Sequence, residues 1–160
     1  MLSKDPLEVR RESLEGATRA LVLRVRLELD AHGHVNNAVF LTYVESARVA
    51  YLLETGAATE LFDMSFIVAR AEIDFRSPVR FGDAVDVGVR ATRFGTRSFD
   101  LEYELRVGNQ LVAEARTVQV GYDYETRETM EIPEEWRQRL APAAVRRPSS
   151  ARRSRTASAF

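Results

Sequence analysis

The sequence predicts an α+β domain in which one antiparallel β-sheet curls around one long α-helix. Apolar and polar residues alternate in five separate segments, which is the period-two pattern of strands with one buried face. Residues 38–54 instead carry apolar residues at helical spacings over more than half of the circumference. The apolar surface of such a helix must be buried on most sides, and the sheet has one apolar face against which the helix can pack.

The expected elements follow in a simple order. A first strand covers residues 20–29, and the helix comes next, with Asn36 or Asn37 as its N-cap and Gly56 as its end. Four further strands are expected at residues 66–79, 85–91, 98–107 and 111–122. The last three are joined by short turns and should be antiparallel neighbours. A short helix over residues 133–140, with a proline in its first turn, completes the fold.

Length and composition indicate one domain. The chain has 160 residues, 45% of them hydrophobic, which is enough for a single core. We expect a lead-in at residues 1–18, the folded domain at residues 19–141 and a disordered tail at residues 142–160, because the tail offers nothing to bury. The tail holds five arginines and no acid, yet the net charge is −1, so the body is acidic, which argues against binding to nucleic acid.

Location and cofactors can also be addressed from the sequence. The chain has no cysteine, which excludes disulfides, thiolate metal sites and cysteine nucleophiles. No apolar run reaches the length of a signal-peptide core or of a membrane span. We therefore expect a cytoplasmic protein with no membrane partner.

The turn before the helix is the unusual stretch of the chain. Residues 30–37 read Asp-Ala-His-Gly-His-Val-Asn-Asn, and residues 43–48 read Tyr-Val-Glu-Ser-Ala-Arg. Together with Phe81-Gly82-Asp83, these strings closely resemble the hotdog-fold acyl-CoA thioesterases of the 4-hydroxybenzoyl-CoA thioesterase family, over about residues 20–135. The resemblance implies the hotdog fold, hydrolysis of an acyl-CoA thioester to free acid and CoA, and no cofactor. It also implies a homodimer or homotetramer with the active site at a subunit interface.

The resemblance assigns roles to three residues. Asp30 matches the acid that attacks the thioester carbonyl or activates water, and Asn37 matches the residue whose backbone N–H polarises the carbonyl oxygen. Both roles make physical sense, since a helix N-terminus presents unpaired N–H groups to a developing oxyanion and a carboxylate is a competent base or nucleophile. Other hotdog thioesterases use a helix carboxylate, and Glu45 is the second choice for that part.

Five further residues are candidates for substrate binding, each with a structural alternative. Gly33 is expected to provide a backbone conformation or a close approach that a side chain would forbid, and His34 is expected to brace the turn by hydrogen bonding. Asn36 is first a helix cap, and Tyr43 is first a core residue. Arg80 could meet the phosphates of coenzyme A or simply be solvated, as could three other arginines at strand ends, which are Arg76, Arg93 and Arg97.

Four other hypotheses can be weighed at this stage. Asp30, His32 and His34 lie close in sequence, but no further ligand is evident, so we expect no metal site. A hotdog module that binds acyl-CoA without hydrolysing it is one alternative function. Hydrolysis of an acyl group carried by acyl carrier protein is another. Dehydratase chemistry would need His32 or His34 as its catalytic histidine, and their turn does not match the dehydratase pattern.

Overall fold

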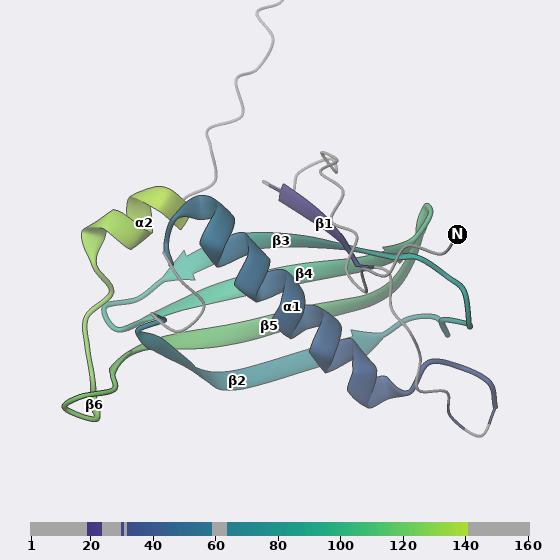
Figure 1. The fold of residues 1–160 in the computed structure, drawn as a ribbon, viewed down its shortest axis with the longest axis horizontal. Coiled ribbons are helices and arrows are strands. Elements are labelled where there is room, and N and C mark those ends of the chain that lie inside the picture. Colours follow the sequence, from purple (N-terminus) through teal and green to yellow (C-terminus); the bar gives the residue numbers. More distant parts are fainter. Residues whose placement is uncertain (1–18, 24–29, 31, 59–63, 141–160) are drawn as a thin grey trace, which may run out of the picture.

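The computed structural model describes residues 19–23, 30, 32–58 and 64–140, with the backbone alone for residues 19–23. A sheet lies in one layer and a long helix crosses one of its faces (Figure 1). The elements are β1 (Arg19–Leu23), α1 (Asn37–Thr55), β2 (Phe66–Phe75), β3 (Val85–Phe94), β4 (Ser98–Val107), β5 (Gln110–Asp123), β6 (Glu128–Thr129) and α2 (Glu134–Leu140). The predicted α+β class and hotdog architecture are confirmed.

The strands pair in the order β1-β3-β4-β5-β2, and every pair is antiparallel. The expected neighbours β3, β4 and β5 are confirmed. β2 pairs with β5 rather than with β3, so the connection at residues 76–84 must pass β5 and β4 to reach β3. This connection, at one end of the sheet, becomes a wall of the candidate site.

Local signals set the ends of α1. The Asn36 side chain accepts a hydrogen bond from the Ala38 N–H at 2.9 Å, so Asn36 is the N-cap. Gly56 adopts a left-handed conformation with φ 72° and donates its N–H to the Leu53 carbonyl. Glycine takes this conformation without steric cost. Both predicted helix ends are confirmed.

The remaining predicted elements differ only at their ends. β1 is described as far as Leu23, and residues 24–29 of the expected first strand lie outside the described part. The terminal helix α2 starts directly after Pro133, whose carbonyl accepts from the Trp136 N–H. The two-residue strand β6, which pairs with the end of β5, was not expected. The predicted lead-in and tail lie outside the described residues, and the domain limits remain a prediction.

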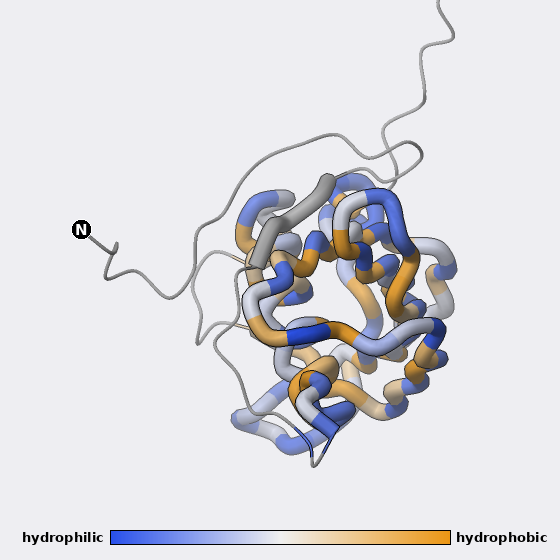
Figure 2. Tube along the Cα trace, turned by 90° about the vertical axis from the view of Figure 1, so that its right-hand side faces the viewer, coloured by the Kyte–Doolittle hydropathy of each residue, from blue (hydrophilic) through white to orange (hydrophobic). Residues whose placement is uncertain are grey.

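The core lies between α1 and the inner face of the sheet. Figure 2 shows hydrophobic and hydrophilic residues alternating along the strands. α1 contributes the buried side chains of Phe40, Tyr43, Val44, Ala47, Tyr51 and Leu52. One polar cluster is enclosed with them, where the Tyr103 hydroxyl lies 2.8 Å from the Thr117 hydroxyl, beside Gln119. These groups satisfy one another, as burial requires.

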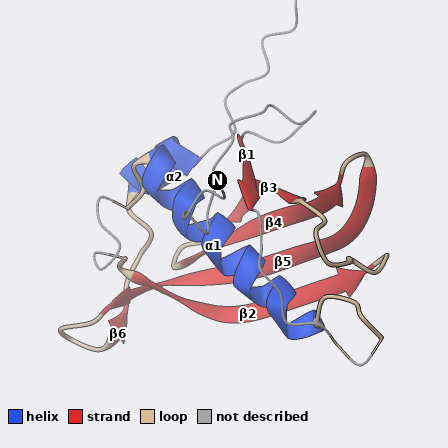
Figure 3. Cartoon of the chain, turned by 45° about the vertical axis from the view of Figure 1, so that its right-hand side comes forward, coloured by secondary structure: helices blue, strands red, loops and turns tan. Residues whose placement is uncertain are grey.

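One flank of the core is open within a single chain. α1 packs chiefly against β1 and β3 and lies obliquely over the sheet (Figure 3). The inner face of β2 is left uncovered, with Phe75 45% exposed and Ala71 also exposed, and Leu41 of α1 is 47% exposed. The helix is therefore covered less completely than its apolar arc predicts. None of the described helices has the length and apolar character needed to cross a membrane.

Candidate active site

The Asp30 turn is a closed, hydrogen-bonded loop. The Asp30 N–H donates to the His34 carbonyl at 2.7 Å, and the Gly33 N–H donates to the Asp30 carbonyl at 3.1 Å. Gly33 has φ 78°, in the left-handed region that residues with a side chain rarely adopt. The prediction that Gly33 provides a special backbone conformation is therefore confirmed. No heavy atom lies within 4 Å of the place where a Cβ would stand, so conformation is the reason for glycine here.

The two oxygens of the Asp30 carboxylate have different surroundings. Oδ1 accepts the backbone N–H groups of His32 at 2.8 Å and His34 at 3.0 Å. These two hydrogen bonds, first that of His34 and then that of His32, hold the pKa of Asp30 below its ordinary value. Among the described residues, the group recorded near Oδ2 is the His34 ring nitrogen, at 4.0 Å. Asp30 is thus an ionised carboxylate at neutral pH, with one anchored oxygen and one accessible oxygen.

The start of α1 supplies a hydrogen-bond donor beside this turn. The Ala38 N–H bonds to the Asn36 side chain, and the Val39 N–H bonds to the Asn36 carbonyl. Among the described residues the N–H of Asn37, the first residue of the helix, has no such partner. The first turn of α1 also holds no acidic residue, so nothing there offsets the positive end of the helix dipole.

Asp30 and Asn37 line the same hollow, of about 280 Å³. Its apolar walls include Phe40 of α1 and Phe75 of β2, whose rings meet edge to face at 5.2 Å between centroids. The remaining wall is the start of the connection between β2 and β3, formed by Arg76, Ser77, Pro78 and Val79. The hollow therefore combines a carboxylate, an N–H donor and apolar cover.

Backbone pairing fixes the connection against the turn. The Val35 N–H donates to the Val79 carbonyl at 2.8 Å, and His34 and Arg80 form an isolated antiparallel bridge. His34 thus braces the turn, as expected, and it does so through its backbone. Arg80 lies just beyond the hollow, next to the Asp30 turn.

The other predicted site residues lie apart from this hollow. Glu45 is eight residues after Asn37, or about 12 Å along the helix axis, and its carboxylate lies 3.8 Å from the Arg48 guanidinium. Tyr43 is buried in the core, which raises its pKa to about 12. Asn36 is engaged as the helix cap. Within one chain, the structure brings only Asp30, His34 and Asn37 of the candidates to the hollow.

Sequence reasoning missed the wall formed by the end of β2 and its connection. The pattern predicts a strand over residues 66–79, whereas β2 ends at Phe75 and the residues from Arg76 to Val79 form the wall. Their place beside Asp30 depends on pairing between β2 and β5, which no local pattern indicates. For metals, the described part of the chain contains no group of three or more potential ligands that could hold an ion.

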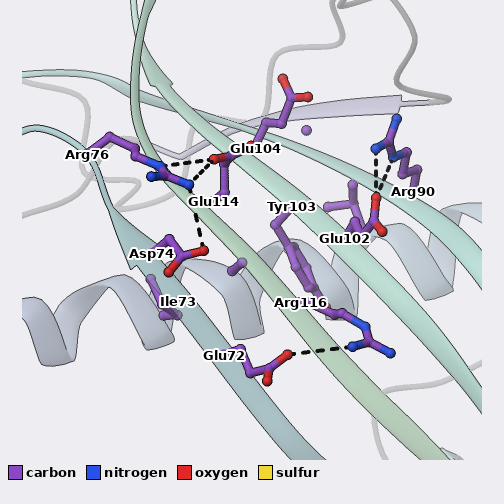
Figure 4. A pocket seen from close by; sticks show the side chains of 13 residues that line it. Glu72, Ile73, Asp74, Arg76, Arg90, Glu102, Tyr103, Glu104, Glu114 and Arg116 are labelled. Atoms are coloured by element: carbon purple, nitrogen blue, oxygen red, sulfur yellow. Dashed lines mark hydrogen bonds and ion pairs between the residues drawn. The ribbon is translucent and has the colours of Figure 1, made fainter.

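A larger hollow, of about 760 Å³, lies on the outer face of the sheet, and Figure 4 shows its charged lining. The Arg76 guanidinium lies 2.9 Å from Glu114 and 3.7 Å from Asp74. The Arg90 guanidinium lies 2.7 Å from Glu102. No residue of the Asp30 turn lines this hollow. Its charges are already paired with one another, so it offers no free reactive group.

A curled sheet around one helix, with a carboxylate and an N–H donor near the start of that helix, agrees with the resemblance to the hotdog-fold thioesterases. The sequence bears this out, since residues 25–140 match the Thioesterase-like superfamily, and the chain belongs to that family. A 1,4-dihydroxy-2-naphthoyl-CoA hydrolase from Synechococcus elongatus is 29% identical over 112 residues, which are 67% of this chain and 82% of that protein.

Solved structures agree with this class. A thioesterase from Thermus thermophilus, crystallised with coenzyme A and zinc, is 35% identical with a TM-score of 0.71, covering 79% of this chain and 95% of that one. A 1,4-dihydroxy-2-naphthoyl-CoA thioesterase from Synechocystis is 23% identical with a TM-score of 0.67, covering 76% and 93%. The latter likeness concerns the fold alone.

Proposed function

We propose that the chain hydrolyses an acyl-CoA thioester in the hollow beside the Asp30 turn. The observation that carries this proposal is the shared hollow, which is lined both by Asp30, with one accessible carboxylate oxygen, and by Asn37, whose N–H is unpaired among the described residues. A carboxylate that attacks and an N–H that receives the developing oxyanion are the two groups thioester hydrolysis needs. A thiolate leaves readily, so a strong general acid is not required.

Two routes use these groups. In the first, Asp30 Oδ2 attacks the carbonyl carbon, the thioester oxygen becomes an oxyanion held by the Asn37 N–H, and collapse expels the CoA thiolate. Water then hydrolyses the resulting anhydride, which releases the acid and restores Asp30. In the second, Asp30 takes a proton from a water molecule that attacks the carbonyl directly. In both routes Oδ2 is the acting oxygen, because Oδ1 is engaged by the N–H groups of His32 and His34.

The hollow also supports a proposal on the acyl group. Its walls include the rings of Phe40 and Phe75, and apolar rings pack well against other rings. The Synechococcus elongatus relative is a 1,4-dihydroxy-2-naphthoyl-CoA hydrolase. We therefore propose an aromatic acyl group. A hydrolysis screen over aryl-CoAs and straight-chain acyl-CoAs tests this, and a preference for long alkyl chains would overturn it.

The central test compares Asp30→Asn with Glu45→Gln. Both variants replace a carboxylate by an amide of the same shape. Release of free thiol from acyl-CoA should fall by roughly 10²–10⁴-fold in Asp30→Asn, whereas Glu45→Gln should stay near the wild-type rate. A folded Asp30→Asn protein with full activity would sink the assignment, and loss of activity in Glu45→Gln alone would transfer the role to Glu45.

Two alternatives are separated by the same assay. A non-catalytic module would bind acyl-CoA saturably and release no thiol. An acyl-carrier-protein thioesterase would hydrolyse acyl carrier protein in preference to the matching acyl-CoA. Hydrolysis that persists after dialysis against a metal chelator would agree with a reaction that needs no cofactor.

We also propose that a second copy of the chain completes the site. β2 pairs with β5 on one side, and its other edge is unpaired among the described residues. Its inner face is uncovered at Phe75, whose ring contacts Phe40 of α1, and the next residue of the helix, Leu41, is exposed. An open strand edge of this kind can pair with another strand. Sedimentation should give at least twice the 18.1 kDa chain mass. Leu41→Lys should dissociate the assembly and lower activity, while a fully active monomer would overturn the proposal.

Cell fractionation would test the proposed cytoplasmic location.

A further inference from the structure

A rigid turn projects an aromatic ring beside the candidate site. Phe81 is 71% exposed, the largest exposed fraction among the large hydrophobic side chains of the described chain. It follows Arg80, which bridges to His34 of the Asp30 turn. A single exposed phenylalanine needs no explanation by itself, but Phe81 is held in a fixed position next to the candidate active site.

Three features make the turn rigid. The Arg80 N–H donates to the Asp83 carboxylate at 2.8 Å, and the Asp83 N–H donates to the Arg80 carbonyl at 3.2 Å. Gly82 has φ 88°, which glycine adopts without strain. The Phe81 ring is therefore presented to solvent by a closed turn whose one acid is engaged with the backbone.

The guanidinium of Arg80 is available to a ligand. Arg76 is paired with Glu114, and Arg97 donates to Thr129. Arg80 has no side-chain partner among the described residues, and its neighbour Asp83 accepts a backbone N–H rather than the guanidinium. Arg93 is likewise without a partner there, but it lies eight residues beyond Val85, about 26 Å along β3 and away from the Asp30 turn.

We propose that Arg80 and Phe81 bind the nucleotide part of coenzyme A, with the guanidinium on a phosphate and the ring stacked on the adenine. Guanidinium groups bind phosphate through two parallel hydrogen bonds, and a base stacks on an exposed aromatic ring. The inference rests on the proposed function, since it assumes that coenzyme A carries the acyl group to Asp30 and that its nucleotide end lies near the same turn. It also separates two carriers, because the phosphopantetheine of acyl carrier protein has a phosphate but no adenine.

The kinetic test uses carriers of different length. The same acyl group is offered as the CoA thioester and as the pantetheine thioester, which lacks the nucleotide. In the wild-type protein the ratio of kcat/KM for the CoA substrate to that for the pantetheine substrate measures the contribution of the nucleotide. Phe81→Ala and Arg80→Ala should each lower this ratio roughly tenfold. Arg93→Ala, which removes another unpaired guanidinium, is the matched control and should leave the ratio unchanged.

A binding test measures the interaction with coenzyme A without any turnover. Phe81→Trp places an indole at the proposed stacking position, where coenzyme A and 3′,5′-ADP should quench its fluorescence and pantetheine should not. The wild-type protein is a suitable blank because its single tryptophan is Trp136 of α2. Loss of CoA binding in Phe81→Ala would uphold the site even if Asp30→Asn showed that the proposed chemistry were wrong.

Three results would overturn the inference. One is unchanged affinity for coenzyme A in both alanine variants. Another is an equal loss of kcat/KM with the CoA and the pantetheine substrates, since that would assign the turn a purely structural role. The third is a change of sedimented mass in Phe81→Ala, which would make the ring a contact between copies of the chain.

Discussion

The two hollows of this molecule differ in how their polar groups are paired. The outer hollow is the larger, and its arginines and carboxylates pair with one another across neighbouring strands. The hollow beside the Asp30 turn is smaller and has fewer polar groups, yet Asp30 Oδ2 and the Asn37 N–H are left without a close partner in the described chain. Arg76 lines both and marks the boundary between them.

Because of this difference, the smaller hollow with its unpaired groups is the proposed reactive site, and the larger one is not. A paired charge on an exposed sheet face contributes modestly to stability and is poorly placed to act on a ligand. The Asp30 carboxylate, held by the backbone N–H groups of His32 and His34 in the turn before α1, keeps its position and its charge. The outer face is thus expected to govern stability and the inner hollow to govern turnover.

The expectation that the inner hollow governs turnover and the outer face governs stability is tested most directly by removing the Asn37 N–H alone. Asn37→Pro removes this donor, and proline is favoured at the first residue of a helix. Asn36 has φ −59° and ψ 137°, the extended conformation that a residue before proline prefers. We expect kcat to fall by roughly 10²–10³-fold, as for the loss of one oxyanion donor, with the unfolding midpoint little changed.

Asn37→Ala is the control for this substitution, because it keeps the N–H and removes the side chain. It should retain most of the activity. If the alanine variant lost as much activity as the proline variant, the Asn37 side chain would carry the effect and the oxyanion assignment would be wrong.

The converse experiment breaks a pair on the outer face. Asp100 of β4 has a side chain only 4% exposed and accepts from the Arg116 guanidinium at 2.6 Å. Asp100→Ala leaves that guanidinium without its closest acceptor, and the free energy of unfolding should fall by about 1.5–3 kcal/mol. Thiol release at 25 °C should be unchanged. Chemical denaturation and steady-state kinetics on one preparation measure both, and a loss of activity in the folded variant would contradict the division.

Local patterns predicted the parts of the fold that depend on near neighbours in sequence. Asn36 caps α1 and Gly56 ends it through contacts with residues no more than three positions away. The alternation in β3 and β4 likewise predicted which residues face the core, whereas in the second half of β5 the buried residues are Thr117 and Gln119 rather than Val118 and Val120. The Asp30 turn was singled out because its residue types are unusual before an apolar helix.

Features that depend on distant pairing were not predictable in this way. The placement of β2 beside β5 leaves no local signal, so the wall of the hollow at Phe75 and Val79 was missed. The separation of Glu45 from the hollow follows from the direction of α1 over the sheet, which a helical pattern does not encode. The sequence also could not show that the Arg80 guanidinium lacks a side-chain partner among the described residues, because this depends on which groups its neighbours bind.

The pH dependence of turnover should show the smallest effect, and it tests the role of the Asp30 carboxylate specifically. The backbone N–H groups of His34 and His32 lower the pKa of Asp30, so the carboxylate stays ionised as the pH falls towards its ordinary range. The stabilisation from these bonds is present above that ordinary value and is lost as the pH falls through the lowered pKa. The profile of kcat/KM against pH should therefore have no acid limb from Asp30 between pH 7 and about 5. Asp30→Glu, whose longer side chain disturbs the two bonds, should move the limb upward, whereas an acid limb between pH 7 and about 5 that Asp30→Glu leaves unchanged would show that another group titrates.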